Sequence, residues 1–247
     1  MNKTLQAEFQ EKWGKYFGTA RLPVCWFYSD TPDKSDLEES NNVNRCLIGN
    51  LNQVFDGQTF VYHKSSPGCL GGKRYTGYSQ KLRSGFRYFL SCGIEGQTEG
   101  ERYKKSPELV DEILKQQKPF QAPADYLIFK RWDKIQEDEN PEVVVFLNPP
   151  DVIAGLFTLA NFDLSDPEGV ITPFGSGCAS IIDYPLRQTK KNNPKSVLGM
   201  FDISARPNVP GDSFTFSVPF NRFKEMAANM DESFLITDSW RKVKRRI

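Results

Sequence analysis

The side chains that could do chemistry in this 247-residue chain are mainly thiols: Cys25, Cys46, Cys69, Cys92 and Cys178, beside one histidine, His63. The cysteine count is odd and no Cys-x-x-Cys pair occurs. This pattern argues against a disulfide framework and against a zinc finger or ribbon, which needs closely paired ligands. One histidine is too few for a histidine metal site. Neither a Walker A loop nor a Gly-x-Gly-x-x-Gly fingerprint is present.

Two of the cysteines follow glycine in loops that look alike, Gly68-Cys69 and Gly177-Cys178. Glycine allows a close approach of the backbone, and the free amides of a helix that follows would favour an anion. A thiol there would have a lowered pKa and would be a better nucleophile or soft-metal ligand. We therefore expect Gly68, Cys69, Gly177 and Cys178 to bind a ligand, with both cysteines as candidate metal ligands. The alternative is a tight turn that buries a small residue.

The other three cysteines, Cys25, Cys46 and Cys92, lie in apolar stretches, and we expect them in the core. Arg102 and Arg206 lie in corresponding stretches of the two halves of the chain. A guanidinium can bind a carboxylate or phosphate through two parallel hydrogen bonds, so both arginines are candidate anion ligands. Surface salt bridges are the competing explanation.

Hydrophobic periodicity predicts alternating helices and strands. In the first half we expect helices over residues 4–17, 43–55 and from Pro107, and strands over 24–28, 60–62, 86–91, 101–103 and 126–129. In the second half we expect strands over 143–147, 169–172, 197–201 and 213–218, with helices after Pro150 and Pro219. The unbroken apolar run over 143–147 is typical of a strand that is covered on both faces.

The two halves resemble one unit used twice. Residues 24–27 match 143–146, the Cys69 loop matches the Cys178 loop, and a tyrosine follows each loop, Tyr75 and Tyr184. Residues 126–128 with Trp132 likewise match 234–236 with Trp240. The sequence therefore predicts an α+β fold of two similar mixed α/β lobes from an internal duplication, packed as one compact domain. The expected parts are an N-terminal helix (1–20), a first lobe (21–136) and a second lobe (141–247). A pseudo-two-fold axis would then bring Cys69 and Cys178 together at the seam between the lobes, where small-molecule pockets often form.

Composition excludes several classes of protein. The net charge of +1 gives no support for binding nucleic acid or an anionic membrane. Hydrophobic residues at 38% and aromatic residues at 13% supply a core, so general disorder is excluded. No apolar run approaches the roughly 20 residues of a membrane helix. The first residues are charged throughout, so we expect no secretory signal and a reducing, cytoplasmic setting.

Five segments resemble the uncharacterised ArCR-type family, domain of unknown function 169, which occurs in archaea and anaerobic bacteria. They are residues 173–180 (PFGSGCAS), 199–207 (GMFDISARP), 234–240 (FLITDSW), 99–103 (EGERY) and 129–134 (FKRWDK). The resemblance runs from about Leu22 to Ile247. It implies no activity and no catalytic residue. The link with anaerobes favours oxygen-sensitive thiol or iron–sulfur chemistry.

Three functions remain open. The favoured one is binding of a small anionic ligand or cofactor between the two Gly-Cys loops. The second is a metal ion or iron–sulfur cluster on Cys69 and Cys178. Two cysteines are too few for a four-thiolate cluster, so either a homodimer would supply four or the loops would add oxygen ligands. The third is a thiol enzyme, for which only His63 or a carboxylate could serve as the base.

Overall fold

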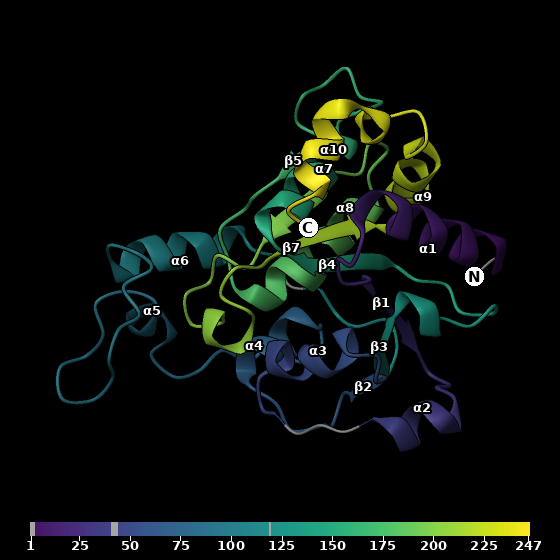
Figure 1. Cartoon of the computed structure of the whole chain (residues 1–247). Helices are drawn as coiled ribbons and strands as arrows, with labels where there is room; N and C mark the ends of the chain where they lie inside the picture. The colour runs from purple at the N-terminus through teal and green to yellow at the C-terminus, as the bar shows by residue number, and fades with distance from the viewer. Residues whose placement is uncertain (1–2, 41–43, 119) are drawn as a thin grey trace.

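The computed structural model describes residues 3–40, 44–118 and 120–247, which form one seven-stranded sheet with helices on both faces (Figure 1). The strands are β1 (Val24–Ser29), β2 (Phe60–His63), β3 (Tyr126–Arg131), β4 (Val143–Asn148), β5 (Val170–Ile171), β6 (Ser196–Gly199) and β7 (Phe214–Pro219). The α-helices are α1 (Lys3–Phe17), α2 (Lys34–Glu39), α3 (Leu47–Phe55), α4 (Leu70–Tyr75), α5 (Phe86–Phe89), α6 (Pro107–Gln116), α7 (Pro150–Leu159), α8 (Tyr184–Thr189), α9 (Phe220–Asn229) and α10 (Asp238–Lys244). The mixed α/β class is as predicted.

The strand order is β2-β3-β1-β4-β7-β6-β5, and all neighbours are antiparallel except β5 and β6. The two central strands come from different halves of the chain: β1 pairs with β4 through Val24 opposite Val145 and Trp26 opposite Val143. Outward from this pair, β1-β3-β2 and β4-β7-β6 follow the same antiparallel scheme. One sheet therefore joins both halves. An internal duplication of the sequence stays a prediction.

Alternation along the strands sends apolar side chains to both faces of the sheet. On one face Phe146 and Phe216 pack against α1, α7, α9 and α10, where Phe9, Trp13 and Phe223 form the largest aromatic cluster. On the other face Trp26 and Val145 pack against α3 and the helical segment that contains Ile181. All six residues of β4 are buried, which confirms that this strand is covered on both faces.

Several local predictions are wrong. Residues 86–91 contain the short helix α5, whose N-cap Gly85 has φ of 66°, and residues 101–103 form no strand. Residues 234–236 form the single 3-10 turn η4 (Phe234–Ile236), so the proposed match with β3 fails; the apolar triplet closes a turn in which the Ser233 hydroxyl accepts from the Leu235 amide. The helix expected over 43–55 begins at Leu47, and residues 41–43 lie outside the described residues.

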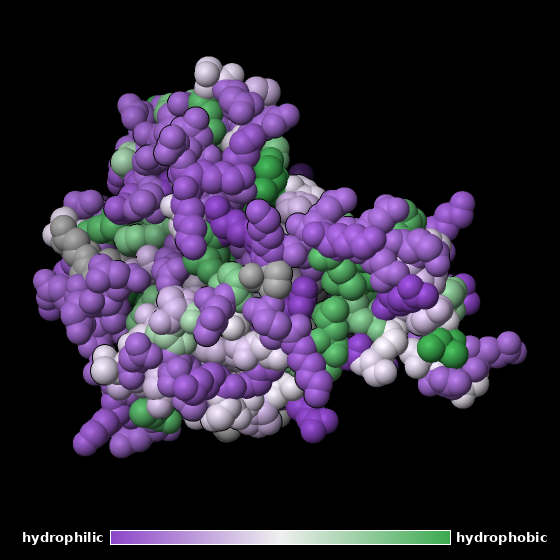
Figure 2. Space-filling model, turned by 180° about the vertical axis from the view of Figure 1, so that it is seen from behind, coloured by the Kyte–Doolittle hydropathy of each residue, from purple (hydrophilic) through white to green (hydrophobic). Residues whose placement is uncertain are grey.

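Within the described residues, no helix has the length and apolar character needed to cross a membrane. The face seen in Figure 2 is mostly hydrophilic, with hydrophobic side chains in separate small groups. The basic end of the chain belongs to α10 and the residues after it, as expected of a solvated helix end.

Candidate functional site

The two Gly-Cys loops each lead directly into a helix, as the ligand-binding prediction requires. Cys69 is exposed and is the N-cap of α4; its Sγ accepts a hydrogen bond from the Gly72 amide at 3.2 Å. Cys178 is buried and precedes η2 (Ala179–Asp183), a π-helical turn that continues into α8. Such π-helical turns are rare and are frequent at functional sites.

The two loops lie side by side. The helix α4 packs against η2, and the side chain of Ser176 acts to lower the pKa of Tyr75 across the contact, against the larger effect of burial, which raises it. The charge of Cys69 raises the pKa of Cys178, and Tyr184 raises that of Tyr75, so each matched pair of residues lies within electrostatic range. The loops that the sequence comparison aligned are therefore neighbours in the fold.

A third thiol belongs to this group, and it was missed. Cys46 is the half-buried N-cap of α3, and its charge, like that of Cys69, raises the pKa of Cys178. The Cys69 amide donates to the carbonyl of Arg45 at 3.0 Å, which ties the two loops together. The sequence predicted a helix from residue 43, which put Cys46 inside it; because the helix begins at Leu47, Cys46 is its cap instead.

Of the two remaining cysteines, one lies in the core as predicted and the other does not. Cys25 is fully buried on β1, which confirms that it is a core residue. Cys92 is exposed, so its assignment to the core is wrong. It lies in the turn after α5, directly after the segment 86–91 that the sequence wrongly predicted as a strand.

Both glycines of the loops are needed for close packing. A Cβ on Gly68 would lie 2.1 Å from the hydroxyl oxygen of Tyr62, a side chain that is 2% exposed. A Cβ on Gly177 would lie 3.0 Å from Cβ of Ala205, 3.2 Å from Sδ of Met200 and 3.5 Å from Cγ1 of Ile48. At these two positions the backbone of each loop is therefore approached closely by side chains from other segments.

The Cys178 thiol is not an activated nucleophile. Burial, reinforced by Cys69, Cys46 and Asp202, raises its pKa well above its ordinary value, so it is protonated at neutral pH. This is the opposite of the lowered pKa expected from the sequence. His63 is engaged elsewhere: its Nδ1 lies 2.6 Å from Oγ of Ser65, and its ring packs on Tyr126.

The buried carboxylate of Asp202 holds the Cys178 loop in place through hydrogen bonds. One oxygen of Asp202 accepts from the Gly177 amide at 3.1 Å, and the other accepts from the hydroxyls of Ser204 at 2.7 Å and Tyr103 at 3.2 Å. The stretches that carry Arg102 and Arg206 therefore do meet. Among the described residues, only two outside glycine have positive φ, Arg102 and Met200, and both adjoin this contact. Backbone strain of this kind concentrates at functional sites.

The two arginines themselves are not seen at the thiols. Arg102 is exposed. Arg206 donates to the carbonyls of Ser213 and Gly211 and stacks on Phe214, so its guanidinium holds its own loop closed.

The distances between possible ligand atoms decide whether the thiols could hold a single metal ion. Within the described residues, the only three acidic, thiol or imidazole ligand atoms that lie within 4.8 Å of one another are those of Asp33, Asp36 and Glu139. The ammonium of Lys130 pairs with Asp36 and Glu139 and takes the place of a cation there. Two thiolates on one zinc ion lie at most about 4.6 Å apart, twice the Zn–S bond of about 2.3 Å. The three thiols as they stand are therefore not all close enough together to bind one ion.

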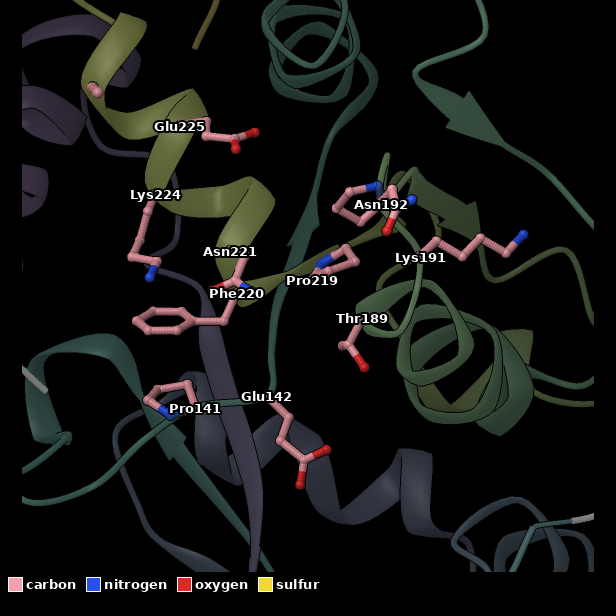
Figure 3. A pocket seen from close by; sticks show the side chains of 12 residues that line it. Pro141, Glu142, Thr189, Lys191, Asn192, Pro219, Phe220, Asn221, Lys224 and Glu225 are labelled. Carbon is pink, nitrogen blue, oxygen red and sulfur yellow. The ribbon is translucent and has the colours of Figure 1, made fainter.

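A separate hollow of about 780 Å³ lies between α9, the loop before β6 and the segment before β4 (Figure 3). Polar side chains of both charge signs line it, among them Glu142, Lys191, Lys224 and Glu225. Burial raises the pKa of Glu142. No cysteine lines this hollow.

A family model described as uncharacterised ArCR, domain of unknown function 169, matches residues 14–229. No curated protein and no solved structure matches the chain.

Proposed function

The chain belongs to the uncharacterised ArCR family, whose description names no activity, and we propose that it binds a thiophilic metal cofactor, an iron–sulfur cluster before a single ion, through Cys46, Cys69 and Cys178. The observation that carries the proposal is that three free thiols stand on segments that contact one another: the Cys69 amide donates to the Arg45 carbonyl, and α4 packs against η2. Thiolates are the ligands that hold iron–sulfur clusters.

The surroundings favour a cofactor over a catalytic thiol. A metal binds only the thiolate and displaces the proton of a protonated thiol, whereas a nucleophile needs the thiolate without a metal. Exposed Cys69 gives access from solvent, and buried Cys178 gives a ligand that water cannot displace easily. Because the three thiols are not all close enough together to bind one ion, a cluster is favoured, since its cysteines bind different iron atoms.

A small anionic ligand between the loops is the second candidate. The cations beside the thiols support it: Arg45 precedes Cys46, and Lys73 and Arg74 follow Cys69. The segments 44–49 and 66–76 contain no acidic residue that would offset them. The same charge also suits an iron–sulfur cluster, which carries negative charge when thiolates hold it.

Metal and sulfide content tests the proposal. We expect protein purified without oxygen to be coloured and to contain iron and acid-labile sulfide, and Cys46→Ser, Cys69→Ser and Cys178→Ser each to lower both. Cys92→Ser is the matched control, because Cys92 is exposed but lies outside the three-thiol group. Colourless, metal-free wild-type protein that takes up neither iron and sulfide nor a soft ion would overturn the proposal, and native mass spectrometry would reveal an organic anion in its place.

The remaining sequence predictions belong with this proposal. The duplicated lobes are supported by the matching registers of β1-β3-β2 and β4-β7-β6 and by the adjacency of the two loops. With three thiols in one chain, the cofactor does not depend on a homodimer. We take the setting to be cytoplasmic and the partner to be a small molecule rather than nucleic acid, in line with the net charge of +1.

A further inference from the structure

We propose that a second site, separate from the thiols, binds a free amino acid in a hollow beside the start of α7. The hollow has a volume of about 410 Å³ and lies where β4 ends, between the segment before β1 and the loop before β7. The last residues of the sequence close it from one side, where α10 packs on α7 (Figure 1). No described cysteine lines it, and its volume is within the range of small-molecule sites.

One end of the hollow presents donors that suit a carboxylate. The first hydrogen bond of α7 runs from the Ile153 amide to the Pro149 carbonyl at 3.1 Å, so the amides of Asp151 and Val152 have no partner in the helix. Both residues line the hollow. The carboxylate of Asp151 pairs with Nε of Arg246 at 2.9 Å, which brings a guanidinium to the same end. Free amides at a helix start and a guanidinium together favour an anion.

Asn148 is the observation that calls for more than an anion. Its side chain lines the hollow and is 1% exposed. Its Nδ2 donates to the Arg21 carbonyl at 3.3 Å, and its Oδ1 has no hydrogen-bond partner within the part of the chain that the structure describes. A buried carbonyl oxygen without a donor costs free energy, so a ligand that donates to it gains affinity. A carboxylate has no proton to donate, so the ligand needs a donor group as well.

The charges of the lining favour an ammonium group as that donor. The exposed carboxylate of Asp212 lines the hollow and accepts from the Ser213 hydroxyl at 3.3 Å. With Asp151 it balances the two cationic side chains of the lining, Arg21 and Arg246. A lining whose side-chain charges cancel suits a ligand whose own charges cancel, and it suits a phosphate less well. A carboxylate and an ammonium group on one carbon atom meet both requirements.

The rest of the lining can receive an apolar side chain. It is formed largely by apolar residues, Ala20, Leu147, Pro149, Pro150, Val152 and Pro210. The loop that carries Asp212 is held by Arg206, whose guanidinium donates to the carbonyls of Gly211 and Ser213 on either side. Arg206 is therefore a positioning residue of this hollow, which is formed before any ligand arrives.

Thermal unfolding of the full chain with each proteinogenic L-amino acid, added singly, is the first test. A ligand that binds only the folded chain raises Tm, and we expect the apolar amino acids, leucine among them, to do so. Calorimetry then compares leucine with 4-methylpentanoate, which lacks the ammonium group, and 3-methylbutylamine, which lacks the carboxylate. Each analogue should bind at least about tenfold more weakly than leucine, as loss of a hydrogen bond to a charged group costs.

Variants assign each end of the ligand to its residues. Arg246→Gln should weaken the binding of leucine and of 4-methylpentanoate alike, because both carry the carboxylate. Asn148→Leu and Asp212→Asn should weaken leucine and leave 4-methylpentanoate unchanged. Because Asp212 is exposed, its variant keeps the test valid if Asn148→Leu does not fold. Arg241→Gln is the matched control, because Arg241 is also exposed and paired with an aspartate, Asp238, but does not line the hollow.

The proposal is wrong if no amino acid raises Tm, or if leucine binds wild-type protein no more tightly than 4-methylpentanoate. It is also wrong if Asp212→Asn binds leucine as tightly as wild type, or if Arg241→Gln weakens binding as much as Arg246→Gln. Cys178→Ser should bind leucine as wild type does, so this site and the three-thiol site stand or fail independently.

Discussion

At the scale of single residues, the central observation is that a thiol can be reactive, ligating or inert according to its surroundings. Cys25 and Cys178 are both buried, but only Cys178 has other thiols nearby. Cys92 is exposed and lies outside the thiol group, whereas exposed Cys69 lies beside Cys178. What distinguishes the candidate site is therefore that its thiols stand on neighbouring segments, and not that any one of them is buried.

The raised thiol pKa values predict how apoprotein stability depends on pH. In the folded state Cys25 and Cys178 hold their protons above the unfolded value of about 8.5, so the folded chain binds more protons than the unfolded chain in alkaline solution. Their contribution is fully present below about pH 8.5 and decreases as the pH rises further. The free energy of unfolding, from urea titrations at pH 7.5 and pH 9.5, should therefore fall. Cys178→Ala should reduce the fall; an equal fall in this variant would contradict the assignment.

At the scale of elements, much of the site follows from how helices begin. Cys46 and Cys69 cap α3 and α4, and Cys178 precedes η2. The sequence singled out the two Gly-Cys loops but predicted no helix after either of them. It did not predict the meeting with the Cys46 segment, which depends on how α3 packs on the sheet over a long separation in sequence.

The two glycines on either side of Cys69 should respond in opposite ways to alanine. A Cβ on Gly71 would meet no atom within 4 Å, and alanine in α4 should stabilise the protein by up to about 1 kcal/mol. Gly68→Ala should destabilise it by about 1–3 kcal/mol, because the added carbon meets the hydroxyl of Tyr62. Thermal unfolding measures both.

Removal of the obstructing atom provides the control. The double variant Gly68→Ala with Tyr62→Phe should recover part of the loss, since the oxygen that a Cβ would meet at 2.1 Å is gone. If Gly68→Ala alone is as stable as wild type, the close approach of this loop is not required.

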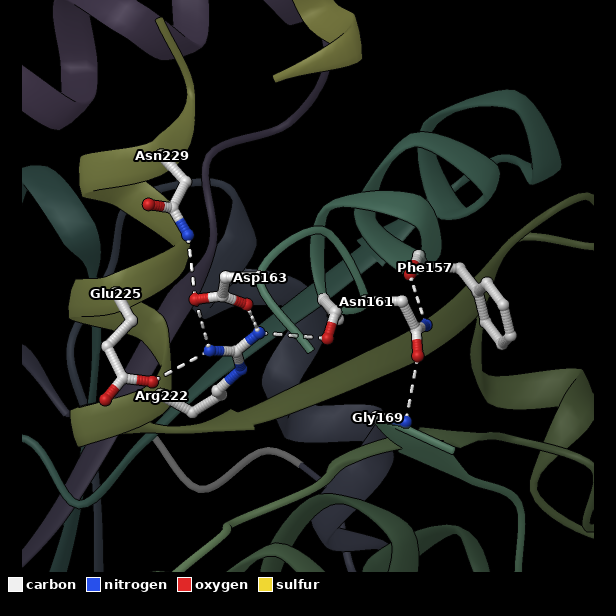
Figure 4. A network of polar contacts seen from close by, with 8 residues as sticks. Phe157, Asn161, Asp163, Gly169, Arg222, Glu225 and Asn229 are labelled. Atoms are coloured by element: carbon white, nitrogen blue, oxygen red, sulfur yellow. Dashed lines mark hydrogen bonds and ion pairs between the residues drawn. The ribbon is translucent and has the colours of Figure 1, made fainter. Parts of the chain in front are cut away.

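Two buried cations, Lys130 and Arg222, form ion pairs that join separate elements. The carboxylates that pair with Lys130 are buried, and those that pair with Arg222 are partly exposed. Lys130 on β3, 1% exposed, pairs with Asp36 and Glu139, both at most 10% exposed. Arg222 on α9 pairs with Asp163 and Glu225 and donates to the Ala160 carbonyl (Figure 4). The carboxylates of Asp163 and Glu225 are 31% and 58% exposed, so water can reach them if the arginine is removed.

Lys130→Met should therefore cost more stability than Arg222→Met. The first removes the cation that neutralises two buried carboxylates and should cost about 3–5 kcal/mol. The second removes hydrogen bonds to charges that water can replace and should cost about 1.5–3 kcal/mol. Urea unfolding measures both, with Arg241→Met as the control, since its pair with Asp238 is exposed on both sides. The reverse order of the two costs would contradict the importance of burial here.

At the scale of the whole molecule, the class of fold was predictable and the connections were not. The runs at 24–28 and 143–147 were recognisable as strands because they are apolar and β-branched or aromatic. The two strands lie side by side at the centre of one sheet, and no local sequence pattern predicts this pairing. The triplets at 126–128 and 234–236 look alike, yet the first lies in β3, which pairs with a strand on each side, and the second forms a turn.

The shared sheet predicts that the chain unfolds as one unit. The indole of Trp26 donates to the Ile181 carbonyl at 2.8 Å, and that of Trp240 donates to the Tyr16 carbonyl at 2.8 Å, so the halves interlock on both faces. Unfolding of the apoprotein in urea, followed by tryptophan fluorescence and by far-ultraviolet circular dichroism, should give coincident single transitions. Two separated transitions would mean that the lobes are independent domains.

The central claim is that three thiols from distant segments hold one metal cofactor. X-ray absorption at the metal edge of protein prepared without oxygen tests it most directly, because the spectrum reports which atoms surround the metal. The account predicts sulfur neighbours throughout in wild-type protein, with one protein sulfur replaced by a lighter atom in Cys178→Ser and no change in Cys92→Ser. A metal surrounded by oxygen and nitrogen, or a spectrum unaltered by Cys178→Ser, would contradict it.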